Sequence, residues 1–153
     1  MNQNNMDDID KKLLNILQKE FPLTERPFFA VANKCGLSEE EVISRVRKLK
    51  EKGILRRIGA IFNGANLGRV STLCTARVPE EKLDNFVSAV NACSGVTHNY
   101  LRNNDYNVWF TVNASSRIEI DRFLAQLKEN TGVTDILEMQ AVRTFKIDAS
   151  FEL

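Results

Sequence analysis

Apolar and polar positions alternate with the period of a helix through the N-terminal third of the chain. Apolar residues recur at helical spacing over 6–18, where aspartates begin the run. A proline in the first turn predicts a second helix over 27–34, and Gly36 begins a short turn after it. Ser38 opens a third helix, with a glutamate in the capping-box position, and Gly53 ends it.

The next segment, 54–62, alternates loosely and predicts a strand pair or wing. Three short helices, the last two separated by a tight turn with glycine, are typical of a helix-turn-helix. With the wing added, residues 1–64 are expected to form a winged helix-turn-helix domain.

Residues 65–153 alternate between strand and helix patterns. The pattern predicts strands over 71–78, 96–101, 107–112 and 134–142, with helices over 79–93 and from Ser115. The polar residues 102–106 fit a hairpin connection between the two middle strands. This βαββαβ order predicts a ferredoxin-like domain, so the whole chain belongs to the α+β class.

Such a sheet has helices on one face only. The other face must be buried against something, and a partner sheet or a bound planar ligand are the two candidates.

Composition narrows the class of protein. The 153-residue chain has a net charge of only +1, whereas a nucleic-acid-binding domain usually carries a marked basic excess. No apolar run is long enough to cross a bilayer, and residues 1–5 do not resemble a secretory leader. Three isolated cysteines fit reduced thiols and neither a disulfide framework nor a zinc site. We therefore expect a cytoplasmic protein that has no membrane contact and does not bind DNA.

The only histidine of the chain, His98, lies in the strand predicted over 96–101. Histidine exchanges a proton near neutral pH and also binds metals. A lone histidine on a strand also fits a packed, hydrogen-bonded structural residue, and residue type alone leaves both roles open.

The domain order and several motifs resemble the Lrp/AsnC transcription regulators. The matching residues include 10–14, 35–38, the 53–54 helix exit and the 105–106 hairpin. That resemblance implies a DNA-binding regulator with a small-molecule sensor domain. However, residues 39–41, which would approach the bases, are three glutamates. Glutamates also stabilise a helix N-terminus, and the basic residues over 45–52 fit either phosphate contact or a solvated face.

Four segments look like a narrower group of Lrp/AsnC-like proteins, the siroheme decarboxylases of haem synthesis. They lie at residues 21–28, 56–62, 71–74 and 95–110, and the last segment contains His98. The similarity extends over essentially the whole chain. It implies conversion of siroheme to 12,18-didecarboxysiroheme by non-oxidative loss of two acetate carboxyl groups. No cofactor is implied apart from the iron-containing tetrapyrrole, which binds as substrate or product.

The implied chemistry assigns roles to particular side chains. Decarboxylation needs an acid, and His98 is the candidate catalytic residue, either as proton donor or as an axial ligand to the substrate iron. Tyr100, two residues along the same strand, is expected to orient it or donate a hydrogen bond.

Substrate binding is assigned to cations and to an aromatic side chain. The candidates for the tetrapyrrole carboxylates are Arg56, Arg57 and Arg102, because guanidinium groups pair with carboxylates bidentately. Strand alternation would point the first two to opposite faces. Trp109 is expected to stack on the ring and Asn107 to make a polar contact; Arg143 and Lys146 are weaker candidates.

The family resemblance also implies a partner. The chain is expected to pair with a paralogous decarboxylase subunit as a heterodimer, or with itself, through the open sheet face. It leaves open which of the two subunits this is, and whether the chain is catalytic or only completes a partner's pocket. The alternative function is that of an Lrp/AsnC-type DNA-binding transcription regulator, with a tetrapyrrole as one candidate for the ligand it senses.

Overall fold

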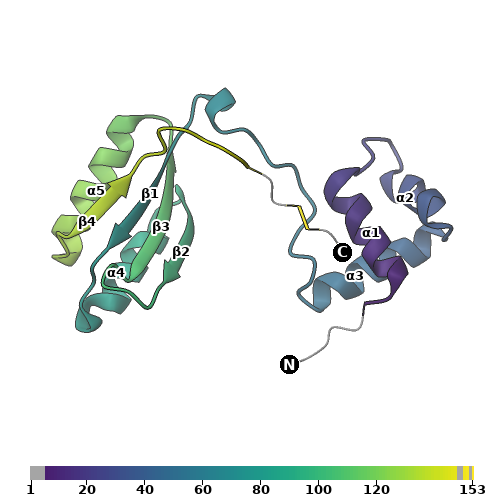
Figure 1. Cartoon of the computed structure of the whole chain (residues 1–153), viewed down its shortest axis with the longest axis horizontal. Coiled ribbons are helices and arrows are strands. Elements are labelled where there is room, and N and C mark those ends of the chain that lie inside the picture. The colour runs from purple at the N-terminus through teal and green to yellow at the C-terminus, as the bar shows by residue number, and fades with distance from the viewer. Residues whose placement is uncertain (1–5, 148–149, 152) are drawn as a thin grey trace. The chain divides into compact units, whose positions relative to one another are not determined.

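The fold is described from a computed structural model, which describes residues 6–147, 150, 151 and 153 (Figure 1). The chain divides into two compact units. Unit 1 comprises residues within 1–60 together with those from 146 onward, and unit 2 comprises 61–145. The predicted domains were 1–64 and 65–153, so the C-terminal residues group differently from that prediction.

Three hydrogen bonds join the C-terminal residues of unit 1 to its N-terminal part. The side-chain amide of Gln18 donates to the carbonyl of Phe151 and accepts from its N–H at 3.0 Å. Asn15 donates to the carbonyl of Leu153 at 3.3 Å. Phe151 and Leu153 thus contact the first helix of unit 1.

Unit 1 is built on three helices: α1 (Asp8–Lys19), α2 (Pro27–Cys35) and α3 (Glu39–Glu51). The predicted caps are present: the Ser38 hydroxyl accepts from the Glu41 N–H at 3.1 Å, and Gly36 is left-handed at the end of α2. All three helices bury their apolar stripes in one core, formed by Leu13, Leu14, Ile16, Val31, Ala32, Val42 and Leu49. The helix-turn-helix prediction is confirmed.

The predicted wing strands are absent from the described residues. Residues 55–63 have no regular structure, and most of them are exposed. A strand needs a hydrogen-bonded neighbour to be stable, and among the described residues no segment pairs with this one. The prediction of a strand pair over 54–62 was therefore wrong.

Unit 2 contains one antiparallel sheet in the order β2-β3-β1-β4. Its strands are β1 (Val70–Ala76), β2 (Val96–Leu101), β3 (Val108–Ala114) and β4 (Ile136–Met139). A 3-10 turn (Glu80–Lys82) precedes α4 (Leu83–Ala92), and α5 (Arg117–Thr131) connects β3 to β4. This is the predicted βαββαβ order, although β4 is shorter than expected at both ends.

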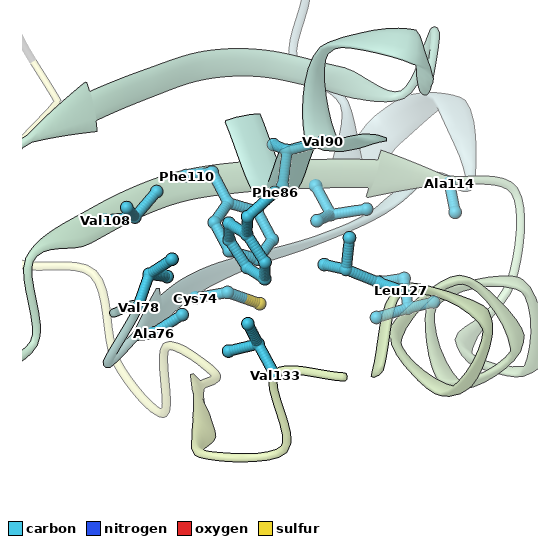
Figure 2. Packing of buried hydrophobic residues seen from close by; sticks show 12 residues of the cluster. Cys74, Ala76, Val78, Phe86, Val90, Val108, Phe110, Ala114, Leu127 and Val133 are labelled. Carbon is cyan, nitrogen blue, oxygen red and sulfur yellow. The ribbon is translucent and has the colours of Figure 1, made fainter. Parts of the chain in front are cut away.

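The core of unit 2 lies between the two helices and one face of the sheet (Figure 2). Phe86 of α4 meets Phe110 of β3 edge to face, with 6.2 Å between ring centroids. Ile120 and Leu127 of α5 join the same cluster. Cys74 lies within it, and burial raises the pKa of its thiol to about 12, so this cysteine is a packing residue.

The other face of the sheet is open. Its apolar residues Leu73, Tyr100, Leu137 and Met139 are each more than a third exposed. Along β3, buried Phe110 and Val112 alternate with partly exposed Trp109 and Thr111. The predicted one-sided sheet is therefore observed, and its open face presents a broad, partly apolar surface.

Candidate functional site

His98 lies on β2, an edge strand that pairs with β3. The pairing shifts register between the two strands: Val96 faces Val112, but His98 faces Thr111. This irregularity is a β-bulge with one extra residue on β2. It aims His98 at the open face, where its side chain is exposed.

An aromatic and cationic row runs along β2 from His98. The His98 and Tyr100 rings stack with 6.1 Å between centroids and 30° between planes. The Arg102 guanidinium lies 4.9 Å from the centroid of the Tyr100 ring. The structure thus brings together three residues predicted from sequence, with a titratable ring at one end and a fixed positive charge at the other.

Hydroxyl groups contact the inner nitrogen of His98. The Thr97 hydroxyl lies 3.0 Å from His98 Nδ1, and the Thr111 hydroxyl lies 3.3 Å from it. The two hydroxyl oxygens are 2.9 Å apart, and Asn113 donates to Thr97 at 3.2 Å. Sequence reasoning missed these three residues. Alternation along β3 from Trp109 could have found Thr111 and Asn113, but the bulge hides Thr97.

Trp109 faces Tyr100 across the strand pair. Its indole N–H is already used, because it donates to the Tyr106 carbonyl at 2.7 Å. Only the ring surface of Trp109 remains for a ligand, which is consistent with the predicted stacking role.

Asn107 is tied to the backbone at the end of β1. Its amide donates to the Val78 carbonyl at 2.8 Å and accepts from the Val78 N–H at 2.9 Å. These two bonds clamp the hairpin to the neighbouring strand. Contact between Asn107 and a substrate stays a prediction.

The remaining predicted cations lie elsewhere in the chain. Arg56 and Arg57 are exposed in the irregular segment of unit 1. They are not on a strand, so the expectation that alternation points them to opposite faces does not apply. Arg143 lies 4.9 Å from the centroid of the Phe145 ring, and Lys146 belongs to the C-terminal part of unit 1.

Three charged side chains of α3, those of Glu39, Glu41 and Arg45, form ion pairs within unit 1. Arg45 donates at 2.8 Å to both Asp7 and Asp10, and at 3.3 Å to Glu41. Arg26 pairs with Glu39. The Asp10 N–H and Arg45 hold the pKa of Asp7 below its ordinary value of 3.8. Arg45 is therefore engaged within unit 1 instead of projecting toward a phosphate backbone.

The described part of the chain offers no cluster of metal ligands and no membrane-spanning helix. It holds no group of three or more histidine, cysteine or acidic side chains that could bind a metal. Among the same residues, no helix has the length and apolar character needed to span a bilayer.

Comparison with known proteins identifies the family. Residues 10–56 match the model described as the siroheme decarboxylase NirDL-like HTH domain, and 66–146 match the AsnC-like ligand binding domain. The siroheme decarboxylase alpha subunit of Desulfovibrio desulfuricans is 50% identical over 148 residues, which cover 97% of this chain and 85% of that protein. The chain belongs to the siroheme decarboxylase family.

Solved structures of siroheme decarboxylases share its fold. The crystal structure of the siroheme decarboxylase NirDL superposes with a TM-score of 0.72 at 36% identity, over 95% of this chain and 48% of that one. NirDL in complex with an iron-uroporphyrin III analogue gives a TM-score of 0.68 at 35% identity, over 91% of this chain and 47% of that one. This siroheme decarboxylase chain thus spans about half the length of NirDL.

Proposed function

We propose that this chain is a subunit of a siroheme decarboxylase that converts siroheme to 12,18-didecarboxysiroheme. The observation that carries the proposal is the exposed His98–Tyr100–Arg102 row on the open sheet face of a chain that is 50% identical to a siroheme decarboxylase alpha subunit. A family member crystallised with an iron-uroporphyrin analogue supports an iron tetrapyrrole as the ligand.

The reaction needs a proton at the carbon that loses its carboxylate. When carbon dioxide leaves an acetate side chain, the electron pair of the broken carbon–carbon bond remains on the methylene and the conjugated ring. A proton then completes a methyl group, so the step consumes one proton and no oxidant. His98 supplies that proton, because histidine is the side chain that most often acts as a general acid.

Arginines hold the carboxylates that do not react. Arg102 lies beside the ring row of β2, and Arg56 and Arg57 are exposed cations of unit 1. An arginine bound tightly to the reacting carboxylate would stabilise the ground state and slow carbon dioxide loss. The reacting acetate therefore lies in drier surroundings, while the arginines bind the propionates and the other acetate.

The open face binds a second subunit. Leu73, Leu137 and Met139, on β1 and β4, expose apolar surface on the same face as the row, and such a face is normally covered in an assembly. A paralogous subunit or a second copy placed there would enclose the tetrapyrrole between two sheets. The three cysteines are unpaired, which agrees with action in the reducing cytoplasm.

The test is a mass measurement. The purified chain is incubated anaerobically with siroheme, alone and with its candidate partner subunit. We expect loss of two carboxyl groups as carbon dioxide in at least one setting. No mass change in either setting would contradict the proposal, and DNA retention that weakens steeply with salt would favour a regulator instead.

A further inference from the structure

The hydroxyl cluster beside His98, formed by Thr97 and Thr111, has no role in the function proposed above. Thr97 and Thr111 converge on one ring nitrogen, Nδ1, at 3.0 and 3.3 Å. The other nitrogen, Nε2, has no hydrogen-bond partner among residues 6–147. The ring is therefore held from one side and free on the other.

Local backbone geometry builds this cluster. The register shift between Val96 and His98 lets both Thr97 and His98 reach the same residue, Thr111, on β3. In a regular strand, neighbours would point to opposite faces. Gly95 precedes the bulge and accepts from the Asn113 N–H at 2.8 Å, which fixes the start of β2 against β3.

The hydrogen-bond capacities of the cluster allow Thr97 to donate to Nδ1. Asn113 donates to the Thr97 oxygen, and the Thr111 hydroxyl can fill the second acceptor position of that oxygen. The single proton of the Thr97 hydroxyl then points at Nδ1. When Thr97 donates in this way, Nδ1 is an acceptor and a neutral ring carries its proton on Nε2.

The same atoms also serve the protonated ring. Because a hydroxyl rotates freely, Thr97 can accept from Nδ1–H and donate to Thr111 once the imidazole carries both protons. Both protonation states keep the ring in one orientation, with Nε2–H toward the open face.

We propose that Thr97 and Thr111 are positioning residues that hold His98 by Nδ1, so that Nε2 is the nitrogen presented to the tetrapyrrole. This inference rests on the proposed function only for the identity of the substrate. The position of a general acid strongly affects the reaction rate, because a displacement of about 1 Å can lower the rate about a hundredfold.

The test is ¹⁵N NMR spectroscopy of the imidazole ring, in the ¹⁵N-labelled full chain without a histidine tag. His98 is the only histidine, so every imidazole signal belongs to it. The variants are Thr97→Val and Thr111→Val, which remove the hydroxyl at similar volume, and Thr97→Ser and Thr111→Ser, which keep it. Thr134→Val is the control, because Thr134 is an exposed threonine outside the cluster.

We expect the wild-type neutral ring to show one tautomer, protonated at Nε2. The valine variants should show a mixture of tautomers, and the serine variants and Thr134→Val should retain the wild-type spectrum. With siroheme and the partner subunit, the valine variants should lose about tenfold to a hundredfold in kcat with little change in KM, and serine should restore most of it.

Two outcomes would overturn the inference. One is a wild-type tautomer pattern that the valine variants leave unchanged, and the other is full kcat in both valine variants. The spectra need no substrate, so they decide the tautomer even if the chain has no decarboxylase activity. Failure of the proposed function would instead appear as an inactive wild type with the expected spectra.

Discussion

Gly95 and Asn113 approach so closely that a β-carbon on residue 95 would lie 2.4 Å from the main-chain oxygen of Asn113. No side chain can fit at this distance without moving the backbone of β2 away from β3. The contact lies at the start of the bulge that aims His98, so it links the backbone of the sheet to the candidate catalytic ring.

Gly95→Ala should therefore destabilise unit 2 and displace His98. We expect a loss of about 1–3 kcal/mol in the free energy of unfolding, measured by urea denaturation, together with reduced turnover. Gly59→Ala is the matched control, because nothing lies within 4 Å of the added carbon there. Equal stability of the two variants would show that β2 relaxes freely.

His98→Ala should abolish turnover or slow it by about a hundredfold or more, since general acid catalysis is worth at least that much. The side chain is exposed, so the fold should be retained. Mass spectrometry of the product and circular dichroism of the variant check both parts. Full activity would remove His98 from the mechanism.

The absorption spectrum of the siroheme complex separates the two roles of His98. A proton donor leaves the iron ligands unchanged, so His98→Ala should keep the wild-type spectrum. An axial ligand would give a band shift in that variant. We expect the unshifted spectrum, since a histidine bound to iron through Nε2 cannot also deliver a proton from that atom.

Arg57→Ala and Arg102→Ala should weaken substrate binding more than they change stability. A charge-assisted hydrogen bond contributes about 1.5–3 kcal/mol, so each change should raise the Kd for siroheme by about tenfold or more. Arg47→Ala, another exposed arginine of unit 1, is the control for loss of charge. Titration of siroheme absorbance measures Kd, and unchanged affinity would refute the role of the residue concerned.

Arg117 should govern part of the acid sensitivity of unit 2. Its guanidinium pairs with Glu138 through two hydrogen bonds, which hold the pKa of that carboxyl below its ordinary value of 4.5. A lowered pKa in the folded state stabilises the protein above pH 4.5, and this stabilisation is lost as the pH falls through the folded value.

Arg117→Met should therefore lower the free energy of unfolding at neutral pH only modestly, because the arginine is 42% exposed and solvent screens the pair. It should also make stability fall less steeply below pH 4.5. Arg122→Met, an exposed arginine on the same helix, serves as the control. Thermal unfolding across this pH range gives the comparison, and parallel curves for Arg117→Met and the wild type would contradict the assignment.

Local signals in the sequence determined most of the secondary structure. Helix caps such as Ser38 and the left-handed Gly36 depend on neighbours three or four residues away, and the apolar periodicity of α1, α3 and α5 depends only on spacing. The strand signal of β2 is also local, because it depends on the residue types within the segment, and β2 was predicted at its observed bounds, Val96–Leu101. His98, Tyr100 and Arg102 could be grouped from alternation along that single strand.

The tertiary structure decided what depends on distant partners. Residues 54–62 have a strand-like pattern, but no strand of the described chain lies beside them to pair with, so they form no wing. Arg45 forms ion pairs with Asp7 and Asp10, which lie more than thirty residues earlier in the sequence but beside it in the fold. Thr97 reaches His98 only because a bulge breaks the alternation that sequence reasoning assumes. The spacing of residues along the chain determines which side chains share a helix or strand. Strand pairing, register and ion pairs between elements involve residues that are far apart in sequence, and these residues meet only in the folded chain.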